Sequence, residues 1–421
     1  MIPVAGAGPR PLRRRLESGA TVVARRNPIT PAVTFMLAFD AGSAFDPPDR
    51  PGLAAFTART IDRGTPELSA DALAGEIESR GASIEVTSNR QCLMFTATCL
   101  DDDFEAMLAL AARMAQAPAF PPDQIELRRQ ETLTRLAQDA ENTGAAATAR
   151  FFERLYGDGH PYAHAPRGTE ASIAGLTRGD LAAFHRARVR PDLLTAAIVG
   201  DIDAGRACDA LAAAIDGLQA AGGVPSRSLP MPVAPAARDR SAIDVPGKAQ
   251  ADIAYGFLGP GRLDPGYYAC WVMNTVLGQY GMGGRLGENI REEQGMAYYA
   301  YSSYDAHRIP GPLLIRAGVD PANVERTIAA IDEEVARIAS GGVTREERDD
   351  AVRYLIGSIP RLLETNAGIA QFLITEEQFG LGEDFDQRLP ALLSAVTVEE
   401  VSAAAAGLDP ARAVIAVAGA L

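Results

Sequence analysis

The sequence predicts an α+β fold of two tandem homologous α/β-sandwich domains, each an antiparallel sheet with helices packed on one face. Three observations support this prediction. A segment rich in proline and glycine divides the chain of 421 residues near its middle. Strand-like runs and capped helices follow one another in each half. The two halves also begin and end with similar runs, which is typical of a tandem duplication.

The dividing segment covers residues 222–247. Its prolines are Pro225, Pro230, Pro232, Pro235 and Pro246. Proline fixes φ and lacks the amide hydrogen that a sheet requires, so we expect an extended linker without secondary structure. The predicted domains are therefore residues 1–221 and residues 248–421, each of ordinary domain size.

The similarity between the halves is clearest at their starts and ends. Strand-like runs at residues 33–39 and 253–257 each precede a turn and an apolar helix. Residues 194–200 and 412–419 are β-rich runs that close on glycine. Each of these later runs follows a helix whose start carries a threonine capping signal. We therefore expect the same order of elements in both domains.

The elements of the first half are marked by caps and by alternation. Ser69 is placed to cap a helix that ends near Gly81. Residues 83–88 and 91–100 follow as two strands joined by a two-residue turn. Further helices are predicted from Asp101 or Asp102 to Met114 and over residues 123–140.

Two long helices are predicted in the second half. Asp320 and Pro321 provide the N-cap and the first turn of one helix. Thr344 and Glu347 form a capping box for the next helix, which Pro360 should kink or end.

Composition excludes several classes of protein. The net charge of −14 argues against a nucleic-acid partner, which requires a basic surface. The four cysteines include no Cys-x-x-Cys pair, so we expect buried free thiols. No apolar run reaches the ~18 residues of a membrane-spanning helix, and the start lacks a signal-peptide pattern. The compartment is left open: cytoplasmic, or periplasmic if a signal sequence has been removed.

Several short motifs occur in an order that resembles the pitrilysin, insulinase and mitochondrial processing peptidase family. They are residues 41–48, Gly52-Leu53-Ala54, Gly64-Thr65, His160-Pro161-Tyr162 and residues 168–173. The resemblance covers nearly the whole chain. It implies one half of a clam-like metallopeptidase, built from two homologous domains.

The zinc motif of that family is absent from this chain. The family carries His-x-x-Glu-His on a helix and a third ligand, a glutamate, about 76 residues further on. Here the two histidine positions hold Ala55 and Arg59, the base position holds Ala58, and the counted third position holds Arg135. Methyl groups and guanidinium groups cannot ligate zinc, so we predict no metal at these positions.

The four histidines offer no substitute metal site. His160 and His164 have i, i+4 spacing, but Pro161 lies between them and no general base accompanies them. We expect His185 on a helix face and His307 in a loop next to a turn.

The second half keeps a pair of residues that the resemblance makes functional. Arg291 and Tyr298 are seven positions apart, as in the family, where the pair binds the substrate carbonyl and stabilises the oxyanion. An arginine and a tyrosine hydroxyl are suitable donors for that task. Tyr299 is the alternative if the strand register differs by one residue.

A glycine-rich segment precedes this pair. It lacks the ending of a phosphate-binding loop, so we expect its glycines to let a peptide approach the backbone closely. The glycines assigned to substrate binding are Gly281, Gly283 and Gly284.

The resemblance therefore implies the non-metal subunit of a heterodimeric zinc peptidase that is inactive alone. A homologous partner with an intact His-x-x-Glu-His motif would supply zinc and the general base. This chain would supply Arg291 and Tyr298. The substrates would be unstructured peptides that add to a sheet edge.

Two alternatives remain open. The chain could be a scaffold or core subunit of a larger complex, with no peptidase role. It could also be a stand-alone enzyme that uses chemistry without zinc. No Ser/His/Asp or Cys/His grouping in the sequence supports the second alternative.

Overall fold

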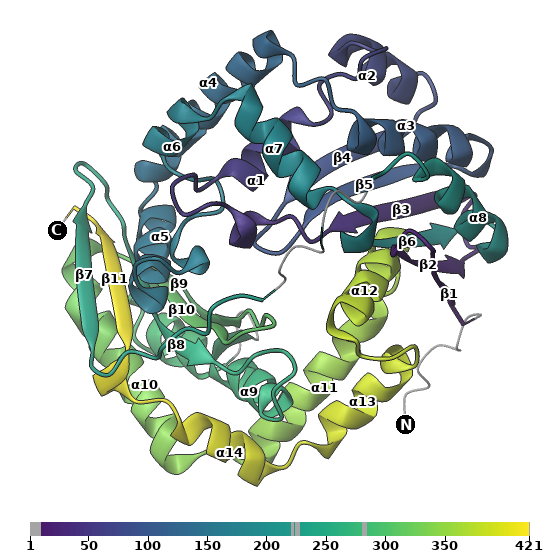
Figure 1. The fold of residues 1–421 in the computed structure, drawn as a ribbon. Helices are drawn as coiled ribbons and strands as arrows, with labels where there is room; N and C mark the ends of the chain where they lie inside the picture. The colour runs from purple at the N-terminus through teal and green to yellow at the C-terminus, as the bar shows by residue number, and fades with distance from the viewer. Residues whose placement is uncertain (1–9, 220–222, 224–227, 280–283, 421) are drawn as a thin grey trace. The chain divides into compact units, whose positions relative to one another are not determined.

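A computed structural model describes residues 10–219, 223, 228–279 and 284–420 (Figure 1). The chain separates into two compact units, each built around one sheet of the described residues. Unit 1 contains Met1–Leu136, Ala165–Ser228 and Pro360–Phe385. Unit 2 contains Ala137–His164, Leu229–Ile359 and Asp386–Leu421.

The sheet of unit 1 has the strand order β1-β2-β6-β3-β5-β4. Neighbouring strands are antiparallel except β2 and β6, which are parallel. The central strand β3 is almost entirely buried, whereas β4 lies at an edge and alternates between exposed and half-buried residues. The strands are β1 (Leu12–Arg15), β2 (Thr21–Arg26), β3 (Ala32–Phe39), β4 (Ser83–Ser88), β5 (Leu93–Leu100) and β6 (Leu194–Gly200).

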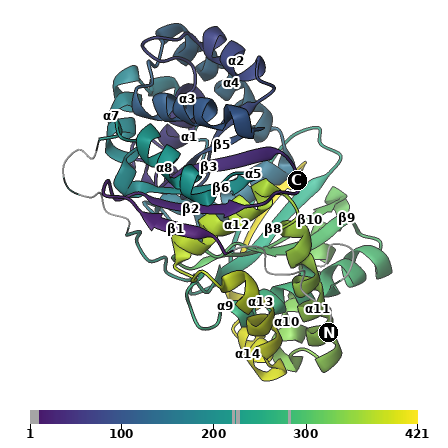
Figure 2. The same ribbon diagram turned by 90° about the vertical axis from the view of Figure 1, so that its right-hand side faces the viewer.

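Helices cover both faces of this sheet. The larger core includes Phe35, Phe39, Phe95 and Phe104 on one face, together with residues of α1, α3, α7 and α8. The opposite face packs against α12, which lies beside β6 in both views (Figures 1 and 2). The helices are α1 (Leu53–Thr60), α2 (Ala70–Glu78), α3 (Phe104–Gln116), α4 (Pro122–Ala140), α6 (Glu170–Gly175), α7 (Arg178–Arg188), α8 (Ala204–Ala214) and α12 (Asn366–Phe379).

The sheet of unit 2 has the strand order β7-β11-β8-β10-β9. Like the first sheet, it contains one parallel pair, here the outer strand β7 with β11, while its other neighbouring strands are antiparallel. Figure 1 shows the parallel pair as teal β7 beside yellow β11. The strands are β7 (Asp239–Asp244), β8 (Ala251–Gly259), β9 (Ala297–Tyr304), β10 (Gly311–Val319) and β11 (Val414–Gly419).

The helices of unit 2 include two π-helical segments next to β9. These are η5 (Thr275–Gln279) and η6 (Gly287–Glu293). The α-helices are α5 (Thr143–Tyr156), α9 (Tyr267–Asn274), α10 (Val324–Gly341), α11 (Arg345–Leu362), α13 (Phe385–Ala395) and α14 (Val398–Ala406). Short 3-10 turns are η1 (Ser43–Phe45), η2 (Asp101–Asp103), η3 (Pro161–Ala163), η4 (Pro191–Leu193), η7 (Pro321–Asn323) and η8 (Pro410–Arg412).

The two halves of the sequence exchange one helix. Helix α5 comes from the first half but packs on β8 and β11 of unit 2. Helix α12 comes from the second half but packs on β3 and β6 of unit 1. Both helices present an apolar stripe, which for α12 is formed by Ile369, Ala370 and Leu373. The compact units therefore differ from the predicted ranges 1–221 and 248–421 in these segments.

The α+β prediction is confirmed, and so are several of its signals. Ser69, Thr177 and Thr397 each accept a hydrogen bond from the first turn of a helix, as their sequence positions predicted. All four cysteines are free and buried. One expectation is wrong: the segment 222–247 is not wholly a linker, because residues 239–244 form strand β7. The strand lies between Pro235 and Pro246, where the backbone keeps its donors.

No single helix among the described residues has the length and hydropathy to cross a membrane. The pair α13 and α14 passes that test only by length and composition when joined, and the two helices are bent by 81° at their junction.

The packing of α12 on the sheet of unit 1 is testable by truncating its central side chain. Leu373 is 3% exposed, so Leu373→Ala is expected to lower the free energy of unfolding by ~2–5 kcal/mol. The matched control Leu127→Ala removes the same atoms from a leucine that is 47% exposed, and should change stability by less than ~0.5 kcal/mol. Urea denaturation followed by circular dichroism measures both. Equal effects would contradict the assigned packing.

Candidate functional site

Helix α1 carries the positions of the missing zinc motif, and a buried carboxylate fixes its start. Asp46 accepts hydrogen bonds from the backbone amides of Gly52, at 2.7 Å, and Ala54, at 2.8 Å. Gly52 has φ 92°, and a side chain there would meet the carbonyl oxygen of Arg167. Burial raises the pKa of Asp46 to about 7, against the opposing effect of these backbone hydrogen bonds.

The motif positions on α1 hold two small side chains and one cation. Ala58 is buried, Ala55 is half-buried, and the side chain of Arg59 is 37% exposed. Arg59 Nη2 donates to Glu131 Oε2 of α4 at 2.8 Å. An arginine–glutamate ion pair therefore stands where the family resemblance placed a metal ligand.

Glu131 is the centre of a larger ion-pair network. Both of its carboxylate oxygens accept from Arg128 Nη1, at 2.8 and 2.7 Å. In the turn after α1, Arg63 Nη2 lies 3.0 Å from Asp62 Oδ2. Burial raises the pKa of Asp62, while the charges of Arg63, Arg128 and Arg59 oppose that rise. The network holds arginines and carboxylates close together at one end of α1.

These residues line a cavity of about 310 Å³. Its walls come from α1, the following turn, α4 and the edge strand β4. The lining residues are Ala58, Arg59, Asp62, Arg63, Ile84, Glu85, Val86 and Arg128. The cavity is thus polar and adjoins the main chain of an edge strand.

Arg135, the position counted from the sequence as the third ligand, lies elsewhere on α4. Its side chain is exposed, one helical turn beyond Glu131. Glu131, one helical turn before the counted position, is the residue of α4 whose carboxylate pairs with Arg59. The sequence did carry one signal for Glu131, because Arg128 precedes it at i, i+3 spacing.

A resident zinc ion does not fit these residues. Two alanines provide no ligand atoms, and an arginine repels a dication. Among the described residues, no group of three or more histidine, cysteine, aspartate or glutamate side chains could hold a metal ion. His185 is buried, with Nε2 2.6 Å from the carbonyl oxygen of Ala115, and burial lowers its pKa. His160 Nδ1 accepts from the backbone amide of Tyr162 at 3.0 Å.

Arg291 and Tyr298 lie on two adjacent elements of unit 2. Arg291 belongs to the π-helical segment η6, which packs against β9, the strand that carries Tyr298. The side chain of Arg291 is 36% exposed, and its Nε lies 3.4 Å from Glu292. Tyr298 is 69% exposed on an edge strand. Both side chains are therefore accessible to a ligand.

The neighbouring Tyr299 is held by a buried carboxylate. Its hydroxyl donates to Asp252 on β8, which also accepts from Thr143 on α5 and from Gln250. Burial and the Asp252 carboxylate raise the pKa of Tyr299. This network fixes α5 to the sheet and points Tyr299 away from the face that Tyr298 occupies, since strand residues alternate. Tyr298 thus remains the candidate for the functional tyrosine.

Of the three glycines assigned to substrate binding, Gly281 and Gly283 lie outside the described residues. Gly284 has φ +95°, and a side chain there would approach the carbonyl oxygen of Val276 to 3.2 Å. Glycine is therefore required at this position by the backbone itself, and its contact with a peptide stays a prediction.

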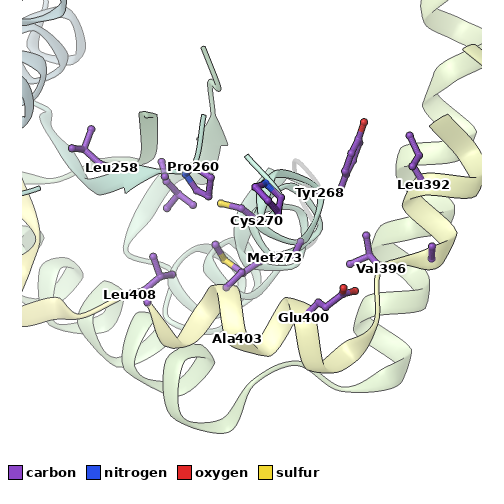
Figure 3. A pocket seen from close by; sticks show the side chains of 18 residues that line it. Leu258, Pro260, Tyr268, Cys270, Met273, Leu392, Val396, Glu400, Ala403 and Leu408 are labelled. Atoms are coloured by element: carbon purple, nitrogen blue, oxygen red, sulfur yellow. The ribbon is translucent and has the colours of Figure 1, made fainter. Parts of the chain in front are cut away.

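Unit 2 also contains an apolar cavity of about 620 Å³, which the sequence did not indicate (Figure 3). Residues of α9, α13 and α14 line it, including Met273, Leu392 and Ala403. Glu400 lies at its wall, and one oxygen of this carboxylate accepts from the backbone amide of Thr397. Burial raises the pKa of the Cys270 thiol to about 12, so this cysteine is protonated at neutral pH and is not a nucleophile.

The absence of zinc ligands predicts the metal content of the purified chain. After incubation with zinc and removal of the free ion by gel filtration, the protein should retain far less than one ion per chain, because the part of the chain that the structure describes offers no donor set for a metal. Mass spectrometry of the metal measures this directly. Retention of one zinc ion per chain would overturn the description of the site.

The buried Asp46 predicts a dependence of stability on pH. Its pKa is raised from 3.8 to about 7, so the folded state binds more protons than the unfolded state in this window. The contribution of Asp46 is therefore fully present at low pH and is lost as the pH rises through about 7, by ~1.4 kcal/mol per pH unit. Asp46→Asn keeps an acceptor oxygen but cannot ionise. Between pH 4 and 7, the free energy of unfolding should fall more steeply for wild type than for the Asp46→Asn variant, because only wild type loses this contribution. Urea unfolding at several pH values measures the difference, and parallel pH profiles of the two proteins would refute the assignment.

Comparisons with known proteins identify the family of this chain. Residues 21–160 match the model of insulinase, peptidase family M16, and residues 175–355 match that of the peptidase M16 inactive domain. An uncharacterized zinc protease of Mycobacterium leprae is 27% identical, over 93% of this chain and 88% of its own. A non-peptidase homolog of Helicobacter pylori is 24% identical, over 92% of this chain and 88% of its own.

Solved structures share the fold. The crystal structure of a peptidase M16 inactive domain from Pseudomonas fluorescens is 28% identical, with a TM-score of 0.91 and coverage of 98% of both chains. A chain of complex III2 from Candida albicans is 16% identical, covers 97% of this chain and 96% of its own, and has a TM-score of 0.81, which shows the fold alone. The matching models, relatives and fold show that this chain belongs to the pitrilysin and insulinase-like M16 family, as a member of the inactive type.

Proposed function

We propose that this chain is the non-metal-binding subunit of a heterodimeric zinc peptidase. The main support for the proposal is the contrast between the two units of the chain. Unit 1 has Arg59 and Glu131 in place of a zinc site, whereas unit 2 keeps Arg291 and Tyr298 with accessible side chains. A homologous subunit with an intact His-x-x-Glu-His motif would complete the enzyme.

Arg291 and Tyr298 supply hydrogen-bond donors without any metal. The guanidinium group is always charged and offers fixed N–H donors, and the tyrosine hydroxyl adds a neutral donor. Donors aimed at a developing oxyanion stabilise the transition state more than the ground state. The zinc of the partner would polarise the carbonyl and activate water. The π-helical turn around Arg291 also favours a functional role, since such turns are frequent at functional sites.

The edge strands of both units favour extended peptides as substrates. Among the described strands, β4 pairs only with β5, and β9 pairs only with β10. Each strand thus presents one row of main-chain donors and acceptors, to which an unstructured peptide could add. Recognition through the main chain would accept many sequences.

The role of Arg291 and Tyr298 is tested in a reconstituted pair of subunits. With a fluorogenic peptide, Arg291→Ala should lower kcat/KM by about 10²–10³, and Tyr298→Phe should lower it by at least about tenfold. The effect should fall mainly on kcat, because the donors act in the transition state. Tyr299→Phe is the matched control, since the hydroxyl of Tyr299 is bound to Asp252, and it should leave kcat/KM within about twofold. Full activity of the Arg291→Ala pair would refute the proposal.

A scaffold role is the second candidate. The non-peptidase homolog of Helicobacter pylori and the fold shared with a chain of complex III2 favour it. In that role the chain would purify with a large assembly, and no peptide cleavage would depend on Arg291 or Tyr298. Affinity purification of the native complex, followed by a peptidase assay, separates the two candidates.

A further inference from the structure

We propose that the arginine-lined cavity of unit 1 binds the C-terminal carboxylate of an extended peptide. The cavity of about 310 Å³ occupies the place of the missing metal site, next to the edge strand β4. The inference takes its ligand class, a peptide, from the proposed function. It assigns a binding role to residues that do not belong to the Arg291 and Tyr298 pair.

Three guanidinium groups converge on this cavity. Arg59 comes from α1, Arg63 from the turn that follows, and Arg128 from α4. Their side chains are 37%, 35% and 20% exposed, so each is mostly buried but reachable from solvent. Arginine is the side chain best suited to recognise a planar carboxylate, because its N–H donors match the two oxygens.

Each of the three arginines has one buried N–H donor that makes no hydrogen bond among the described residues. The ion pairs with Glu131 and Asp62 use terminal Nη atoms. The Nε atoms of Arg59, Arg63 and Arg128 are buried and have no acceptor among the described residues. A buried donor without an acceptor is destabilising, so a ligand with acceptor oxygens would be stabilised there. One carboxylate offers up to about four acceptor positions on two oxygens.

The acidic residues of the cavity select among anions. Asp62 and Glu85 line the cavity, and Glu131 pairs with Arg59 and Arg128 beside it, so these carboxylates balance the three arginines and disfavour unselective binding of anions. Asp62 Oδ1 is buried and receives no hydrogen bond from the described residues. The ligand therefore has to bring one donor together with its acceptors. The last residue of a peptide does so, because its amide N–H lies next to its terminal carboxylate.

A peptide that pairs with the edge strand β4 would lie next to this cavity. Ile84, Glu85 and Val86 of β4 line the cavity, and the free edge of β4 presents main-chain groups beside it. A peptide that adds to β4 would be held along its length by backbone hydrogen bonds. Its terminal carboxylate would then fix the register, which strand addition alone leaves undefined.

The experiment compares two peptides that differ only at the C-terminus. An uncharged decapeptide with an N-terminal fluorophore is made with a free carboxylate and, separately, with a terminal amide. Fluorescence anisotropy measures the Kd of each for the isolated full chain, without partner or zinc. The free carboxylate is expected to bind at least about tenfold more tightly, as befits hydrogen bonds to a charged group.

Variants assign this preference to the cavity. Arg63→Gln and Arg128→Gln should each reduce the ratio of the two Kd values to within about twofold of unity. Arg135→Gln is the matched control, because it changes the same residue type on α4, one turn away and exposed to solvent, and it should keep the full ratio. Thermal unfolding of each variant establishes that it is folded. The proposal is overturned if the two peptides bind equally, or if folded Arg63→Gln and Arg128→Gln keep the ratio.

Inorganic phosphate distinguishes the peptide from a free anion. Phosphate at millimolar concentration should not displace the carboxylate peptide, because it cannot use the strand edge, and displacement would overturn the proposal. These outcomes are independent of the proposed peptidase role. Binding is measured without a partner, so a failure of Arg291→Ala to affect cleavage leaves the inference intact, and a loss of carboxylate preference leaves the catalytic role of Arg291 intact.

Discussion

The ion pair between Arg59 and Glu131, 2.8 Å long, determines which groups α1 presents at the cavity of unit 1. In a fold built to present a metal on α1, it places a fixed monovalent cation where a dication would be coordinated. The Arg59 guanidinium shares the Glu131 carboxylate with Arg128, so two cations neutralise one partly exposed anion. The position therefore stays positively charged but lacks a ligand set that could hold a metal and activate water.

The same separation of tasks appears in the two sheets. Each contains one parallel pair of strands, β2 with β6 in unit 1 and β7 with β11 in unit 2, yet the residues around the two sheets differ in kind. Unit 1 gathers charge beside β4, whereas unit 2 leaves Tyr298 exposed and ties Tyr299 to a buried aspartate. The corresponding edge strands β4 and β9 therefore present different chemistry, charged side chains beside β4 and an exposed tyrosine on β9.

Sequence patterns predicted the features that are determined by residues close together in the sequence. The strands at 83–88 and 93–100, the threonine caps and the free thiols follow from alternation, capping and cysteine spacing. They did not predict contacts that depend on distant partners. A hydrophobic stripe shows which face of α12 is buried but not which sheet covers it. Likewise, the ion pair between Glu131 and Arg59 depends on which residues of α4 face α1, and a residue count along the chain does not show that.

The helix exchange has a consequence for biosynthesis. One face of the first sheet is covered by α12, which begins at Asn366, long after the last strand of that sheet ends at Gly200. During translation, that face stays open to water until most of the polypeptide has left the ribosome. The apolar residues Met36, Ala197 and Val199 are then exposed in the nascent chain. We therefore expect chaperones to bind the nascent chain. A chain truncated before α12 would keep this apolar face exposed and would be prone to aggregation and degradation.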